Sequence, residues 1–268
     1  MTNENQQRDY RERDADLARL RGLRPMDDDF MRCIFRDNIP LAQFVLRILT
    51  DKPDLVINDL NTQKDMKRLV GARSRVLDVY ASDADCNRYD IEIQRAIHGA
   101  DKHRARYHSS AMDIENLNAG QAFEELPETY IIFITESDTF GDGKPCHRIE
   151  RTDLDTEGKP VYGDGTHILY VNGAYHGESE IGRLMHDFRC WNPDDMNYSL
   201  LREASRYYKL NPKGVEIMCQ AFEETRNEKA IQIALRMIAR GKMALEEIAE
   251  DTELPLETIQ KLAEKQTA

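Results

Sequence analysis

Residues 76–94, VLDVYASDADCNRYDIEIQ, form the segment that decides the expected fold. Apolar and polar residues alternate in two runs on either side of a polar loop centred on Asp85, which is typical of a β-hairpin. Antiparallel pairing that is symmetric about Asp85 aligns three pairs of positions: Asp78 with Glu92, Leu77 with Ile93, and Val79 with Ile91.

The two faces of this hairpin are expected to differ, because successive side chains of a strand point to opposite faces. One face carries Asp78, Glu92 and Gln94. The other face is apolar and can be buried; it carries Leu77, Val79, Ile91 and Ile93.

Asp78 and Glu92, directly opposite each other, would have Cβ atoms about 5 Å apart and would repel each other. A hard divalent cation such as Mg²⁺ offsets this repulsion, because it binds carboxylate oxygens and completes its shell with water and phosphate. Such an ion lowers the pKa of a bound water and stabilises charge on a phosphate. The alternation therefore favours a metal site, although an ordinary exposed hairpin with outward polar residues has the same pattern.

The surrounding sequence predicts an α/β fold, with a mixed sheet of four or five strands flanked by helices. Acidic residues 27–29 favour the first turn of a helix, where they meet free N–H groups and the helix dipole. Further helices are expected over about 40–49 and 102–118, strands at 130–135, 147–151 and 167–171, and helices from Ser179 onward.

Three parts of the chain are expected: a polar, partly disordered lead (1–24), the core (25–190) and a helical C-terminal region (191–268). The last part ends in a helix-turn-helix-like pair over residues 244–264. Its second helix has no net positive charge, whereas DNA-reading helices usually offer Arg, Lys, Asn or Gln to the groove. A packing or self-association module, which can form a homo-oligomer, is therefore preferred to DNA docking.

The composition limits the classes of protein. The net charge of −12 gives an overall field that does not attract nucleic acid, so DNA would have to meet a local basic patch.

No run of about 18 apolar residues is present, so no membrane span is expected. The N-terminus lacks the apolar core of a secretory signal, and the five cysteines show no zinc spacing. A cytoplasmic protein with reduced thiols is expected.

The hairpin segment resembles the central hairpin of the PD-(D/E)xK nuclease superfamily. It is most similar to the branch of nuclease family transposases, which are related to the recombination-promoting nucleases of bacteria. In that branch an LDV strand precedes a polar loop and a strand ending in E-x-Q. Three further segments match in order: DDDFMRCIFRDN at 27–38, RARYHSSAMD at 104–113, and YIIFIT at 130–135. The second is similar to an R-x-R-Y-Y motif, with His108 in place of the last tyrosine.

The resemblance implies a restriction-endonuclease-like α/β core and a Mg²⁺-dependent DNA endonuclease, in which Mn²⁺ or Ca²⁺ can also bind. Asp78 and Glu92 match the two acids that bind the metal, with the backbone of Ile93 as a further ligand. Asp28 aligns with an acid that completes the site. Gln94 takes the position of the superfamily lysine. Its amide can orient the attacking water, or it can bond only backbone or solvent at the strand end.

The densest basic stretch of this acidic chain follows the hairpin directly. It contains Arg95, His98, Lys102, His103, Arg104, Arg106 and His108. Arg104 and His108 are four residues apart and share one helix face. Such cations hold phosphates without reading base sequence, so the candidate DNA-binding residues are Arg95, Lys102, Arg104 and Arg106. A solvated helix face is the alternative interpretation.

Three functions compete on the sequence alone. The preferred one is a metal-dependent DNA endonuclease associated with mobile elements or recombination. The second is a catalytically silent family member that binds DNA or a protein partner, and the third is a structural, oligomerising protein of a mobile element.

Overall fold

The computed structural model of the chain describes residues 3–65, 76–95 and 100–267. The chain divides into two compact units. The larger unit is formed by residues 19–211, and the smaller by residues up to Ala18 together with those from Pro212 onward. The division expected from the sequence, after residues 24 and 190, stays a prediction.

The larger unit is built on a mixed sheet that has six strands within the described residues. These are β1 (Ile57–Asp65), β2 (Val76–Asp83), β3 (Arg88–Gln94), β4 (Thr129–Thr135), β5 (Cys146–Ile149) and β6 (Thr166–Asn172). Their order across the sheet is β1-β2-β3-β4-β6-β5. The three central strands β3, β4 and β6 are parallel, while β1, β2 and β5 pair antiparallel with their neighbours. The predicted α/β class with a mixed sheet is therefore confirmed.

The expected number of four or five strands was too low, because β1 was not predicted. Its sequence, INDLNTQKD, has few apolar residues to give the alternation that identifies a half-buried strand. β1 lies at the edge of the sheet and pairs with β2 alone, so a largely polar strand is compatible with this position.

The β2–β3 hairpin has the register that was predicted. Residues 79–82 pair with residues 88–91, beginning with Val79 opposite Ile91. The regular pairing stops there, and Leu77 packs in the same buried cluster as Tyr80. A regular strand would place these two residues on opposite faces, so the predicted apolar face shared by Leu77 and Val79 is not kept at the start of β2.

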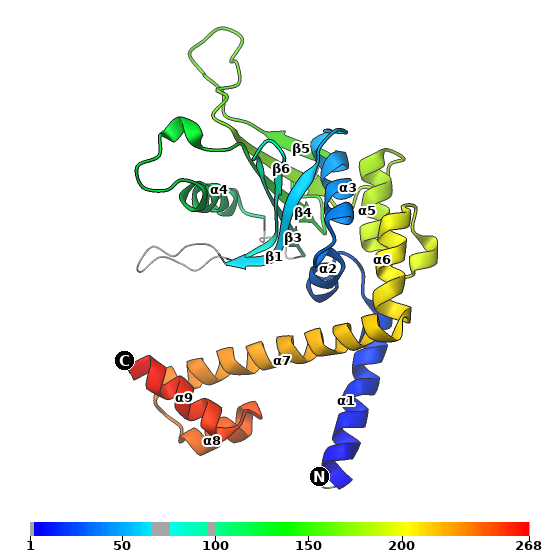
Figure 1. Ribbon diagram of the computed structural model, residues 1–268, viewed down its shortest axis with the longest axis vertical. Helices are drawn as coiled ribbons and strands as arrows, with labels where there is room; N and C mark the ends of the chain where they lie inside the picture. The colour runs from blue at the N-terminus through cyan, green and yellow to red at the C-terminus, as the bar shows by residue number, and fades with distance from the viewer. Residues whose placement is uncertain (1–2, 66–75, 96–99, 268) are drawn as a thin grey trace. The chain divides into compact units, whose positions relative to one another are not determined.

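Helix α4 (Lys102–Asn116) covers one face of the sheet and connects the parallel strands β3 and β4 (Figure 1). The Asp101 side chain caps it by accepting a hydrogen bond from the backbone N–H of His103. Apolar side chains of the helix and the sheet form one buried cluster, which includes Leu77, Tyr80, Ala105, Met112, Ile131, Phe133 and Tyr170. This packing determines which face of α4 lies against β3.

Helices α2 (Asp28–Phe35), α3 (Ile39–Thr50) and α5 (Glu180–Arg189) lie on the other face of the sheet (Figure 1). α2 starts within the acidic run, as predicted, with Asp27 at its N-cap position. α3 is capped by Asn38, whose side chain accepts a hydrogen bond from the N–H of Leu41. α6 (Ser199–Leu210) ends the larger unit.

The smaller unit is helical. It comprises α7 (Pro212–Arg240), α8 (Leu245–Thr252), α9 (Leu256–Thr267) and the part of α1 (Asn3–Gly22) up to Ala18. Ala234, Ile248 and Ile259 bring α7, α8 and α9 together in one buried cluster. None of the helices in the described part of the chain has the length and apolar character needed to cross a membrane.

Candidate metal centre

Strand β3 carries three polar residues at alternate positions, and all three are buried. The exposed fractions of Asp90, Glu92 and Gln94 are 0%, 1% and 9%. In the parallel register Asp90 lies beside Ile131 of β4, and Glu92 beside Phe133. Carboxylates in such apolar surroundings are stable only when charged or hydrogen-bonding groups compensate them.

Helix α4 supplies those compensating groups. Arg104 donates from Nη2 to Oε2 of Glu92 at 2.7 Å and from Nη1 to Oε1 of Gln94 at 2.6 Å. One turn further along the helix, Nδ1 of His108 lies 2.6 Å from Oδ2 of Asp90 and 3.8 Å from Oε1 of Glu92. The spacing of four residues therefore brings both α4 side chains onto the polar row of β3.

Asp90, Glu92 and His108 form a group that could hold a metal ion. One ligand atom from each lies within 4.8 Å of the other two. Neither Asp90 nor His108 was among the site residues predicted from the sequence. Two signals could have found them: Asp90 shares a strand face with Glu92 two residues away, and His108 shares a helix face with Arg104.

Asp78 meets Glu92 at the point where the regular β2–β3 pairing has ended. Its backbone N–H donates to Oε1 of Glu92 at 3.2 Å, and its carboxyl accepts a hydrogen bond from the backbone N–H of Ile93. Burial and then the charge of Glu92 raise the pKa of Asp78 to about 7, against the opposing charge of Arg32. The Asp78 and Glu92 carboxyls therefore lie close enough to act strongly on each other.

Asp28 adds a third acid from the other side of the hairpin. It is the first residue of α2, and its negative charge contributes to the raised pKa of Asp78. The pKa of Asp28 is itself raised, mainly by desolvation, while Arg32 opposes that shift. Asp28 of α2 and Glu92 of β3 therefore both act on Asp78 through their charges.

The acids around Glu92 suit a divalent cation. Ligand atoms of Asp90, Glu92 and His108 lie within 4.8 Å of one another, and Asp78, whose N–H donates to Glu92, offers a further carboxylate. Mg²⁺ and Ca²⁺ prefer such oxygen ligands. Because burial and the charge of Glu92 raise the pKa of Asp78, ionising Asp78 costs free energy. A bound cation would remove that cost.

Gln94 lies at the end of β3 and completes the row. Its Nε2 donates to Oε2 of Glu92 at 3.3 Å, while its Oε1 accepts from Arg104. Both ends of the amide are therefore held inside the site.

The four candidate DNA-binding residues occupy different surroundings. Arg95 pairs with Asp27 at 3.0 Å and with Glu136 at 3.2 Å, and Arg104 lies in the site. Lys102 and Arg106 are exposed on α4, and no ion pair joins either of them to another described residue. His98, which belongs to the same basic stretch, lies outside the described residues.

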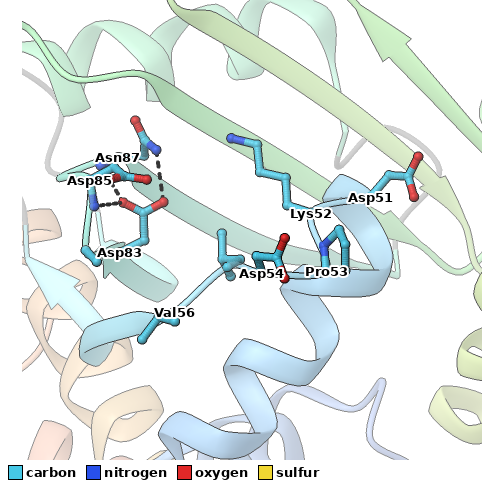
Figure 2. Close-up of a pocket in the computed structure, with 10 residues that line it drawn as sticks. Asp51, Lys52, Pro53, Asp54, Val56, Asp83, Asp85 and Asn87 are labelled. Atoms are coloured by element: carbon cyan, nitrogen blue, oxygen red, sulfur yellow. Dashed lines mark hydrogen bonds between the residues drawn. The ribbon is translucent and has the colours of Figure 1, made fainter.

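A cavity of about 480 Å³ lies at the opposite end of β3 from Gln94, beside the hairpin turn (Figure 2). Figure 2 shows that Asp83 bonds to Asp85 and Asn87 within the turn. Its carboxylate also accepts from the hydroxyl of Tyr89 at 2.7 Å. The residues that line this cavity, 51–56, 83–85 and 87, include none of the candidate site residues, so the cavity is separate from the metal centre.

The chain belongs to the PD-(D/E)XK nuclease family transposases: the model of that family matches residues 37–172, just over half of the 268 residues. The match contains the whole sheet and α4, and therefore Asp78, Glu92, Gln94 and Arg104, while Asp28 precedes it. No curated protein and no solved structure gives a significant match to the chain. The resemblance inferred from the hairpin is thus confirmed, and the family description indicates a nuclease of mobile elements.

Proposed function

We propose that the protein is a Mg²⁺-dependent endonuclease that hydrolyses phosphodiester bonds of DNA, in the movement or recombination of DNA elements. The observation that carries this proposal is the meeting of Asp78 and Glu92 on the hairpin of a nuclease-family fold, where the N–H of Asp78 donates to Oε1 of Glu92 at 3.2 Å. Mn²⁺ or Ca²⁺ can take the place of Mg²⁺ in binding.

Asp78 and Glu92 bind the metal in this proposal, with the backbone carbonyl of Ile93 as a further ligand, and Asp28 completes the acidic cluster. An ion held there would lower the pKa of a bound water and stabilise charge on the phosphate. Gln94 orients the attacking water through its amide, whose two ends are already fixed by Glu92 and Arg104.

DNA phosphates are held by Arg95, Lys102, Arg104 and Arg106. Lys102 and Arg106 extend from α4 into solvent, so they can meet the DNA backbone before it reaches the acids. This local patch is needed because the chain has a net charge of −12.

Two further features complete the proposal. The five cysteines are unpaired in the structure, as expected in a reducing compartment, so we place the protein in the cytoplasm. We assign the helix pair α8–α9 to self-association, because α9 offers Glu257 and Glu264 as well as Lys261 and Lys265.

Nicking of supercoiled plasmid DNA tests the proposed activity. The wild-type protein should convert supercoiled plasmid to open circles with Mg²⁺ or Mn²⁺, and EDTA should stop the reaction. Asp78→Ala should abolish nicking, while Asp85→Ala in the exposed turn should leave it intact. Equal nicking by the wild type and Asp78→Ala would mean that the activity comes from another site or another protein.

A further inference from the structure

Gln94, which takes the position of the superfamily lysine in the proposed nuclease site, is a neutral side chain. Gln94 can donate and accept hydrogen bonds, but it brings no positive charge to the phosphate. Positively charged groups that face developing charge on a transferred phosphoryl group are a major source of transition-state stabilisation. The site therefore gains from a cation that another element supplies.

Arg104 brings a guanidinium to this position. It donates to Oε1 of Gln94 at 2.6 Å and to Oε2 of Glu92 at 2.7 Å. The cation thus lies against the residue that replaces the lysine and against a proposed metal ligand. It comes from α4, ten residues after Gln94 in the sequence.

Packing holds the guanidinium while leaving it accessible. Its Cζ atom lies 5.9 Å from the centre of the Phe133 ring, and its Nε lies 3.4 Å from Nε2 of His108. The Arg104 side chain is 31% exposed, whereas Glu92 is 1% exposed. Arg104 therefore forms the solvent-facing side of the buried polar row, where a DNA phosphate can reach it.

We propose that Arg104 is the cationic residue of this site and binds a non-bridging oxygen of the scissile phosphate. Gln94 then has a second role, because its carbonyl oxygen anchors the guanidinium. Arginine suits this arrangement, since its planar guanidinium can bond to carboxylate, amide and phosphate groups in fixed directions. The inference rests on the proposed nuclease activity and names the group that contacts its substrate.

An alternative role for Arg104 is purely structural, as the partner that neutralises buried Glu92. Both roles predict that Arg104→Gln is less stable, so thermal unfolding does not distinguish them. The two roles predict different cleavage rates for a variant in which a residue of β3, instead of Arg104, supplies the positive charge. A lysine at position 94 would return the charge to the substrate side of the site.

The experiment compares single-turnover cleavage by wild type, Arg104→Gln, Arg104→Lys and the double variant Gln94→Lys/Arg104→Gln. All are assayed at a temperature where circular dichroism shows them folded. Arg104→Gln should cleave about 100-fold more slowly than wild type, and Arg104→Lys should retain part of the rate. The double variant should cleave at least about tenfold faster than Arg104→Gln.

Arg106→Gln serves as the matched comparison, because it removes the same charge from an exposed position on the same helix. The rate loss in Arg104→Gln should exceed that in Arg106→Gln by about tenfold or more. An Arg104→Gln variant that cleaves at the wild-type rate would overturn the inference. So would a folded double variant that is no faster than Arg104→Gln.

A DNA-binding titration separates this inference from the nuclease proposal. It is done in Ca²⁺ with DNA that stays intact, at several salt concentrations. Arg104→Gln should lower the slope of log affinity against log salt by about one, as expected for a lost phosphate contact. An unchanged slope would overturn the inference even if the wild type cleaves nothing, whereas failure of the wild type to cleave would overturn the nuclease proposal.

Discussion

At the scale of single residues, the site is defined by the cost of burying acids. Asp90 and Glu92 are almost fully buried and are compensated by His108 and Arg104. Asp78 has a different environment: burial raises its pKa most, and the charge of the neighbouring Glu92 raises it further. Ionisation of Asp78 is therefore unfavourable in the metal-free protein.

The raised pKa of Asp78 predicts that the free energy of unfolding depends on pH. The pKa of Asp78 is raised from 3.8 to about 7, so between these values the folded protein binds more protons than the unfolded chain. The contribution of Asp78 to the free energy of unfolding therefore falls as pH rises from about 4 to about 7. A shift of this size corresponds to roughly 4 kcal/mol.

Asp78→Asn should remove the fall in the free energy of unfolding that ionisation of Asp78 causes between about pH 4 and about pH 7. In EDTA, the variant should match the wild type near pH 4 and exceed its free energy of unfolding near pH 8, as measured by urea denaturation at each pH. Asp85→Asn, in the exposed hairpin turn, should follow the wild-type curve. If Asp78→Asn also follows the wild-type curve from pH 4 to pH 8, Asp78 is not a buried, high-pKa acid.

Which site residues the sequence could predict depends on where their partners come from. Asp78, Glu92 and Gln94 were predicted from alternation within one hairpin, although that alternation is not kept at the start of β2. Asp90 and His108 were not, because the 2.6 Å contact between them is created when α4 packs on the sheet. Arg104 was predicted to bind phosphate, but its contacts with Glu92 and Gln94 also depend on that packing.

At the scale of elements, the turn-centred symmetry predicted the β2–β3 register correctly over residues 79–82 and 88–91. It could not predict that regular pairing ends before Asp78, because a side-chain carboxylate competes there for the N–H of Asp78. The edge strand β1 was missed for another reason: its stability comes from backbone pairing with β2, and its side chains are mostly polar.

Helix α4 has one side that contacts β3 and one exposed side, and the proposed phosphate contacts of the exposed side predict a separable effect on DNA binding. Arg104 and His108 face β3, whereas Lys102 and Arg106 are exposed. Lys102→Gln/Arg106→Gln should weaken binding to all DNA sequences about equally, because phosphate contacts carry no sequence information. The slope of log affinity against log salt should fall by about two.

The control for α4 is a double variant at exposed cations on another element, Lys229→Gln/Arg236→Gln on α7. It changes the net charge by the same amount, so it should affect the slope only through the general field. If both double variants change the slope equally, α4 carries no specific phosphate-binding surface.

At the scale of the whole molecule, the chain combines a net charge of −12 with a proposed polyanionic substrate. The family match ends at Asn172, so the sheet is shared with the family while α5 to α9 lie beyond the match. The sequence could predict these later segments as helices from their periodicity. Their division into units was not evident, because it depends on which helices pack together.

Metal binding should stabilise the whole fold, since an ion that binds only the folded state shifts the unfolding equilibrium. Mn²⁺ at about 100 times its Kd should add about 2.7 kcal/mol to the free energy of unfolding. The rise in Tm should be largely lost in Asp78→Asn/Glu92→Gln. An equal rise in that variant would place the ion elsewhere.

His108→Asn distinguishes the two candidate groups of metal ligands that share Glu92: the pair Asp78 and Glu92, and the set Asp90, Glu92 and His108. If the ion binds at Asp78 and Glu92, the metal-induced rise in Tm should persist in His108→Asn, although the metal-free protein starts from a lower Tm. Loss of the rise in His108→Asn, together with its retention in Asp78→Asn, would instead assign the ion to Asp90, Glu92 and His108.

The short path from β3 into α4 also has a kinetic consequence. Glu92 and Arg104 are only twelve residues apart, so closing the loop between them costs little chain entropy. Contacts between residues that are near in sequence can form early in folding. Glu92 can therefore pair with Arg104 as soon as α4 packs on β3, before the edge strands of the sheet have formed. The charged site can thus assemble within the unit β3–α4–β4.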